Sequence, residues 1–236
     1  RRSMVELLPL GNCTVNLGIG MPEGVANVAR EENLRDRMTL TVESGPIGGL
    51  PASGLSFGAS YSPSAVLPQP SQFDFYDGGG LDMTCLGMAE CDEAGNVNAS
   101  RFAGRLNGCG GFINISQNAR AVVFAGTFTA GGLEIAVKDG KLRIVKEGRQ
   151  HKFVKQVEEA TFSGDYAKQK RQPVIYVTER CVFELTPDGL ELVEVAPGID
   201  IDKDIIAHMD FKPIVNKPVE MDPRIFIDEP MNLADD

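Results

Sequence analysis

Glu43 is the first residue of this sequence whose type and surroundings suggest chemistry. It follows the apolar and β-branched run MTLTV at 38–42, which predicts a strand, and the Gly and Pro residues after it end that strand. Several glycines between 45 and 54 leave little side-chain bulk beside the carboxylate. Ligands commonly bind at the carboxyl ends of strands in α/β proteins. A carboxylate placed there could accept a hydrogen bond from a ligand or attack it.

Two glycine-rich loops are the second feature with chemical potential. The sequence GIGM at 18–21 lies between an expected strand at 14–17 and an expected helix at about 22–32, and GCGG at 108–111 precedes another helix-like segment. Glycine lets backbone N–H groups approach a ligand closely, and a helix start favours negative charge. Either loop could therefore bind an anion or an oxyanion, or simply permit tight packing of a strand against a helix.

The first loop and Glu43 also fit a nicotinamide-dependent oxidoreductase. In that class, an acid about 20 residues after a glycine-rich turn binds the ribose of the cofactor, so the Gly18–Gly20 turn and Glu43 would share one nucleotide. Against this interpretation, the third glycine falls at Gly24, one position too late for the GxGxxG pattern, and Pro22 lies in the interval. The residues alone leave both roles of Glu43 open.

Composition excludes several other classes of function. A net charge of −10 and the absence of a basic cluster disfavour nucleic-acid binding. No apolar run is long enough to span a bilayer and no signal peptide is recognisable, so we expect a cytoplasmic protein without membrane contact. The five cysteines are odd in number and widely spaced, which predicts free thiols, and the two histidines lack the partners of a metal site or triad.

The order of predicted elements indicates an α/β fold in a chain of 236 residues, without a confident subdivision. Residues 44–80 are rich in Gly, Ser and Pro, and we expect this long irregular segment to form a wall of the active site. The remaining patterns predict a hairpin with arms at 83–90 and 97–100, a strand at 121–125, hairpin turns at 138–141 and 186–189, a helix at 201–209 and an extended tail.

At 42–49 the sequence VESGPIGG resembles the family I CoA-transferases. Four further stretches resemble the second, or β, half of these enzymes in the same order: NLGIGMP at 16–22, FDFYDGGGLD at 73–82, GCGGF at 108–112 and IYVTER at 175–180. The resemblance covers essentially the whole chain. It is nearest to the short-chain acyl branch, which acts on acetate or propionate and has both halves fused. The succinyl-CoA:3-oxoacid branch usually has Glu-Asn-Gly where this chain has ESG at 43–45.

The resemblance implies a three-layer open sheet, of the type shared by CoA-transferases and sugar-phosphate isomerases, with β-hairpin additions over residues 1–236. It implies that Glu43 is the nucleophile and forms a thioester with CoA, and that CoA passes by a ping-pong mechanism from an acyl-CoA to a short-chain carboxylate. No prosthetic group or metal would be needed. The pattern does not name the carboxylate acceptor.

The resemblance also assigns the residues that supply backbone donors to an oxyanion or line the CoA site: Gly18, Ile19, Gly20, Met21, Gly108, Gly110 and Gly111. Asn98, after the hairpin turn, is a further candidate donor, although it equally fits a turn-flanking asparagine. The abrupt start at Arg1 and the scarcity of basic residues agree with a missing α half that completes the site. We expect the complete enzyme to be a homo-oligomer. A non-catalytic effector-binding module of related fold is a further alternative, but the sequence shows no helix-turn-helix segment that would support it.

Overall fold

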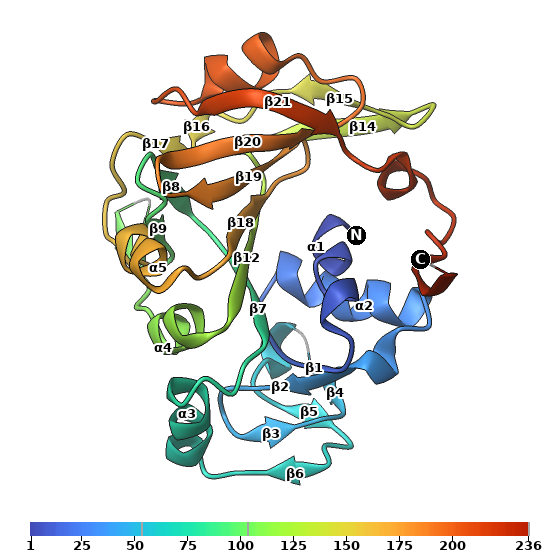
Figure 1. Ribbon diagram of the computed structural model, residues 1–236, viewed down its shortest axis with the longest axis vertical. Coiled ribbons are helices and arrows are strands. Elements are labelled where there is room, and N and C mark those ends of the chain that lie inside the picture. Colours follow the sequence, from blue (N-terminus) through green and yellow to red (C-terminus); the bar gives the residue numbers. More distant parts are fainter. Residues whose placement is uncertain (53, 103, 236) are drawn as a thin grey trace. The chain divides into compact units, whose positions relative to one another are not determined.

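The computed structural model describes residues 1–52, 54–102 and 104–235 (Figure 1). They form two units. Unit 1 comprises Arg1–Gly87, Gly110–Ala125 and the segment from Met231 onward, and unit 2 comprises Met88–Cys109 and Gly126–Pro230. Among the described residues, no helix combines the length and the apolar character that a bilayer crossing requires.

Parallel strands form the centre of unit 1. Strands β1, β2, β7 and β12 pair in parallel in the order β12-β7-β1-β2, and β3 and β6 continue the sheet in antiparallel orientation. The strands of unit 1 are β1 (Cys13–Leu17), β2 (Met38–Thr41), β3 (Pro46–Ile47), β4 (Leu50–Pro51), β5 (Ser60–Tyr61), β6 (Ala65–Val66), β7 (Met83–Gly87) and β12 (Ala121–Ala125). The apolar side chains of the four parallel strands are largely buried, as expected for a sheet covered on both faces.

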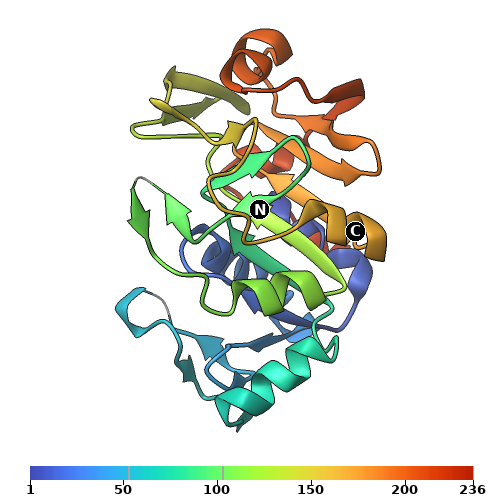
Figure 2. The ribbon, with the colours of Figure 1, turned by 90° about the vertical axis from the view of Figure 1, so that its left-hand side faces the viewer.

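Helices cover both faces of this sheet. Figures 1 and 2 show α1 and α2 on one side of the parallel strands and α3 and α4 on the other, which makes unit 1 a three-layer structure. The helices are α1 (Arg2–Val5), α2 (Gly24–Glu31), α3 (Gln69–Asp77) and α4 (Phe112–Asn118). Asp77, at the end of α3, accepts hydrogen bonds from the side chains of Asn114 (2.9 Å) and Asn118 (3.0 Å), so polar contacts tie α3 to α4.

Unit 2 is built mainly from antiparallel pairs. Its main strands follow the order β21-β20-β19-β18, and Phe128, Phe153 and Phe183 form a fully buried aromatic cluster with ring centroids 4.8–6.5 Å apart. The strands are β8 (Glu90–Asp92), β9 (Val97–Asn98), β10 (Arg101–Phe102), β11 (Arg105–Leu106), β13 (Thr129–Ala130), β14 (Glu134–Lys138), β15 (Lys141–Lys146), β16 (Gln150–His151), β17 (Phe153–Val154), β18 (Val174–Val177), β19 (Cys181–Thr186), β20 (Gly189–Val195) and β21 (Ile214–Glu220). Helix α5 spans Gly164–Lys170.

The structure confirms the α/β class, the hairpin additions and the free thiols, and it corrects three local predictions. Residues 83–87 are a central parallel strand rather than a hairpin arm, because β7 is buried between β1 and β12, and the true hairpin is the short pair β8 and β9. The segment 44–80 contains helix α3, which was not predicted. The helix expected at 201–209 consists of a π-helical turn (Ile201–Ile205) and a 3-10 turn (Ile206–His208).

Gly45 provides a test of how tightly the segment after β2 is packed. Its φ is +126°, and an added Cβ would lie 2.0 Å from the backbone oxygen of Leu67. We expect Gly45→Ala to lower the free energy of unfolding by more than about 3 kcal/mol, because backbone strain and a backbone clash add. Gly24→Ala is the control, since Gly24 is helical (φ −59°) and an added Cβ would meet open space. Urea denaturation showing equal stability for the two variants would contradict this account.

Candidate active site

Glu43 lies at a tight turn directly after β2. The Val42 carbonyl accepts a hydrogen bond from the backbone N–H of Gly45 (2.9 Å), which closes a four-residue turn with Glu43 and Ser44 at its two central positions. The Ser44 hydroxyl donates to the Gly58 carbonyl and anchors the turn on the following segment. The predicted position of Glu43 at the carboxyl end of a strand is therefore confirmed, with Val42 as the first residue of the turn.

The Glu43 carboxylate is half-buried. Within the part of the chain that the structure describes, it accepts no hydrogen bond and forms no ion pair. It lies against Gly111 at the start of α4: a Cβ on Gly111 would be 2.3 Å from Glu43 Oε2 and 2.7 Å from Phe73 Cζ. The missing side chain at Gly111 thus makes room for the carboxylate, and the Phe73 ring flanks the same point.

The loop after β1 begins beside this turn. Asn16 of β1 is opposite Thr41 of β2 in the parallel register, so the segments that follow these two strands leave the sheet at the same edge. The Gly18 amide donates to the Cys85 carbonyl (2.8 Å) and the Gly20 amide donates to Glu23 Oε1 (2.8 Å). Both predicted glycine donors are therefore already used within the protein.

The exposed residues of this loop differ from its glycines. The side chains of Ile19 and Met21 are 60% and 57% exposed, and among the described residues the Ile19 amide has no acceptor. Gly20 has a φ of +85°, which favours glycine at this position. The roles of Gly18, Ile19, Gly20 and Met21 in lining a ligand site stay predictions, with the amides of Ile19 and Met21 as the better placed donors.

Comparison with known proteins identifies the relatives of this chain. No family profile matches it. Acetate CoA-transferase YdiF of Escherichia coli K12 is 49% identical over 99% of the chain, and caffeate CoA-transferase of Acetobacterium woodii is 48% identical over 96%. The crystal structure of acyl-CoA transferase YdiF from E. coli O157:H7, a thioester complex with CoA, matches with a TM-score of 0.90 and 45% identity over 98% of the chain. The chain belongs to the family I CoA-transferases.

The chain spans about 44% of the length of each of these two curated relatives and 45% of the matched crystal chain. The β1–α2–β2 unit has the parallel arrangement that a dinucleotide fold would also require. The comparisons nevertheless favour the CoA-transferase interpretation over the nicotinamide alternative.

The other predicted site residues divide between the two units. Gly110 and Gly111 belong to unit 1, and their amides have no acceptor among the described residues. Gly108 and Asn98 belong to unit 2, where the Gly108 amide, a predicted donor, already donates to the Ser100 carbonyl (3.2 Å). The Asn98 side chain is fully buried. It donates to Glu90 Oε2 (2.8 Å) and to the Arg101 carbonyl, and it accepts from two backbone amides of its own loop. These contacts describe a turn-stabilising asparagine, and its role as an oxyanion donor stays a prediction.

Sequence reasoning missed the side chains of α3 that lie beside Glu43. Gln72 and Tyr76 are four residues apart, so they share one face of α3, and both are completely buried. Gln72 Nε2 donates to the Val42 carbonyl (3.2 Å) and to the Tyr76 hydroxyl (3.0 Å). The signal available in the sequence was this spacing after the Pro residues at 68 and 70, which suit a helix start.

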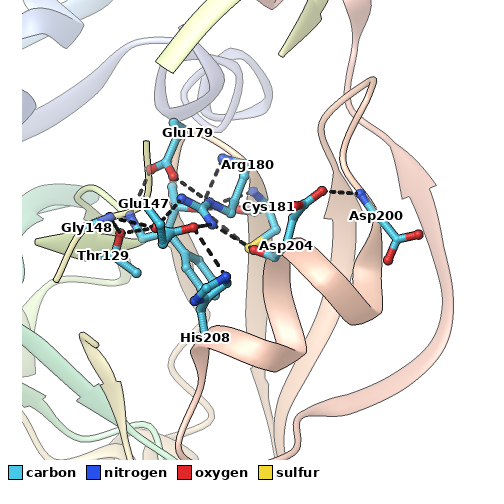
Figure 3. Close-up of polar contacts among 11 residues, drawn as sticks. Thr129, Glu147, Gly148, Glu179, Arg180, Cys181, Asp200, Asp204 and His208 are labelled. Atoms are coloured by element: carbon cyan, nitrogen blue, oxygen red, sulfur yellow. Dashed lines mark hydrogen bonds and ion pairs between the residues drawn. The ribbon is translucent and has the colours of Figure 1, made fainter. Parts of the chain in front are cut away.

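Glu179 and Arg180, the last two residues of the motif at 175–180, belong to a charged cluster in unit 2. The Arg180 side chain is fully buried, and its guanidinium donates to Glu147, Glu179 and the Asp204 carbonyl (Figure 3). Burial raises the pKa of Glu147, but the hydrogen bonds from Arg180 and Thr129 and the Arg180 charge outweigh it and lower the pKa to about 2. These residues have a structural role in unit 2.

The Arg180 cluster predicts a defined pH dependence of stability. We expect Glu147→Gln to lower the free energy of unfolding by about 2 kcal/mol at pH 7, because Arg180 loses one of its two charged partners. The lowered pKa means that the wild-type contribution is present above about pH 4.5 and is lost as the pH falls towards 2, so the difference should shrink at about pH 3.

Urea denaturation at both pH values measures this difference. Glu134→Gln is the matched control, because Glu134 pairs with Lys146 at the surface and should contribute less than about 0.5 kcal/mol. If Glu147→Gln and Glu134→Gln lowered the free energy of unfolding equally at pH 7, burial of Arg180 would not strengthen its ion pairs.

Proposed function

We propose that the enzyme containing residues 1–236 transfers CoA between an acyl-CoA and a carboxylate, with Glu43 as the nucleophile. The observation that carries this proposal is the half-buried Glu43 carboxylate without a hydrogen-bond or ion-pair partner among the described residues, at the carboxyl edge of a parallel sheet. A structural acid of comparable burial, Glu147, is instead held by Arg180 and Thr129. The names of the relatives support the same reaction class.

The reaction balances as two successive exchanges. A Glu43 oxygen attacks the acyl carbonyl carbon of the donor acyl-CoA, which forms a mixed anhydride and releases the CoA thiolate. The thiolate then attacks the Glu43 carbonyl carbon, which releases the donor carboxylate and leaves a glutamyl-CoA thioester. The acceptor carboxylate runs the two steps in reverse. One thioester replaces another, so the sequence of steps conserves the energy of the bond.

The surroundings of Glu43 suit this chemistry. A carboxylate is a weak nucleophile in water, and the Phe73 ring and the start of α4 remove water from one side of it. The oxyanion that forms at each carbonyl needs preorganised donors. We assign this role to the amides of Ile19, Met21, Gly110 and Gly111, which have no acceptor among the described residues.

Partners and substrates follow from the length of the relatives. Because the chain matches less than half of each of the two curated relatives reported above, we propose that an α half completes the CoA and carboxylate sites. We also propose, from the family resemblance alone, that the complete enzyme is a homo-oligomer. The acceptor is a carboxylate in both cases, yet one relative is named for acetate and the other for caffeate at nearly equal identity. We propose a short-chain carboxylate such as acetate or propionate. A panel of carboxylates assayed against one acyl-CoA would decide between the two classes.

The central prediction concerns the covalent intermediate at Glu43. Incubation of the complete enzyme with acetyl-CoA, followed by borohydride, should reduce the residue at position 43, and peptide mass spectrometry would locate the change. Glu43→Gln should lower the exchange rate at least about 10³-fold, because the amide cannot form the anhydride. Glu31→Gln, which changes a surface acid of unit 1, is the control. An unmodified peptide around Glu43 in an enzyme that still exchanges CoA would refute the proposal.

Gly111 offers an independent test of the same site. The methyl group of Gly111→Ala would overlap the Glu43 carboxylate and the Phe73 ring. We expect kcat to fall by about 100-fold, since small displacements of a reacting group have effects of this size, while thermal unfolding changes little if Glu43 moves instead of α4. Gly24→Ala, whose methyl group meets open space, serves as the control. An unchanged kcat in Gly111→Ala would show that the carboxylate reacts from another position.

A further inference from the structure

We propose that Gln72 is a positioning residue for Glu43: its buried amide fixes the turn that presents the nucleophile. The inference rests on the proposed function, since it concerns the reaction of Glu43. Gln72 does not contact the reacting atoms. It acts through the backbone of Val42, the residue directly before Glu43.

The Val42 carbonyl receives two hydrogen bonds. One comes from the Gly45 amide and closes the turn, and the other comes from Gln72 Nε2 (3.2 Å). A carbonyl oxygen has two lone pairs, so this oxygen is fully used. Rotation of the peptide group between Val42 and Glu43 would break both bonds, and Gln72 therefore restrains the orientation from which the Glu43 side chain leaves the backbone.

The orientation of the Gln72 amide is determined by a directed chain of hydrogen bonds. The Tyr76 hydroxyl donates to Thr41 Oγ1 (3.0 Å), and Thr41 Oγ1 donates to the Val15 carbonyl (3.3 Å). The Tyr76 oxygen is thus left to accept from Gln72 Nε2. Turning the amide over would place Gln72 Oε1 against the Val42 carbonyl oxygen, where two acceptors would face each other.

This orientation leaves Gln72 Oε1 buried without a donor among the described residues. A buried unsatisfied acceptor destabilises the folded protein, and an apolar side chain of similar size would avoid it. The arrangement is explained if the two bonds of Nε2 serve the reaction: the amide supplies a donor to Val42 that no apolar residue offers.

Helix α3 reaches the nucleophile by a second route. Phe73, the next residue, flanks the Gly111 position together with the Glu43 carboxylate. Asp77, at the end of the same helix, accepts hydrogen bonds from Asn114 of α4. Helix α3 therefore restrains the backbone next to Glu43 through Gln72. It also restrains the residues that flank the Glu43 carboxylate, through Phe73 and through its contact with α4.

The test uses Gln72→Leu in the complete enzyme. Single-turnover formation of the Glu43 thioester should slow at least about tenfold, while KM for the acyl-CoA changes less than about twofold, because the change misorients the nucleophile without touching the CoA site. Ser71→Ala, an exposed position on the same helix, should leave both unchanged. Tyr76→Phe removes a buried hydroxyl of the same network but keeps the Val42 bond, so it should slow the step less than Gln72→Leu.

Gln72→Glu adds a readout that a purely structural residue would not give. The introduced carboxyl can donate one O–H to Val42 when it is protonated and none when it is ionised. The rate of thioester formation relative to wild type should therefore rise at least about fivefold between about pH 8 and about pH 5.5, since burial favours the protonated form. This second variant also covers the case in which Gln72→Leu does not fold.

The outcomes separate the inference from the function on which it rests. A wild-type enzyme that forms no thioester at Glu43 would overturn the proposed function. A wild-type enzyme that forms it, with Gln72→Leu equally fast or slowed no more than Tyr76→Phe, would overturn the inference alone. A pH-independent rate ratio for a folded Gln72→Glu variant would do the same.

Discussion

The parallel pairing of β1 with β2 is the constraint on which the rest of unit 1 depends. Parallel strands run in the same direction, so the segments that follow them leave the sheet at one edge. This brings the loop at 18–21 and the turn at Glu43 to neighbouring positions, although they are more than 20 residues apart in the chain. The helices on both faces of the sheet then complete the surroundings: α2 follows the loop, α3 bonds the turn through Gln72, and the start of α4 lies against Glu43.

The absence of side chains is as important at this edge as their presence. Gly45 has a backbone conformation that other residues rarely adopt and lies directly against Leu67, while Gly111 leaves the space that the Glu43 carboxylate occupies. Glycine is required at position 45 by the backbone conformation and at position 111 by the space that the Glu43 carboxylate needs. Each position therefore favours glycine, although glycine has no side chain that could take part in a reaction.

Glu147 and the proposed nucleophile Glu43 differ in the partners that surround them. Glu147 is tied to Arg180 and Thr129, and its lowered pKa keeps it ionised and paired over most of the pH range. Glu43 has no such partner among the described residues, and its restraint comes from the backbone through Val42 and Gln72. A nucleophile needs its lone pairs free and its position fixed, and restraint through the backbone provides both.

The sequence by itself determined the elements that local patterns specify and the position of the proposed nucleophile. The strands at 14–17 and 121–125, the hairpins at 138–141 and 186–189, and Glu43 at a strand end all follow from nearby residues. The local pattern at 83–87 predicts a hairpin arm, whereas these residues form a strand whose partners, β1 and β12, are distant in the chain. Only the tertiary structure showed that Gly18 and Gly20 use their amides internally, that Gly111 accommodates Glu43, and that Gln72 bonds Val42. These contacts join segments distant in sequence or depend on the direction of a single N–H bond. Residue type and spacing predict neither the contact between distant segments nor the direction of the bond.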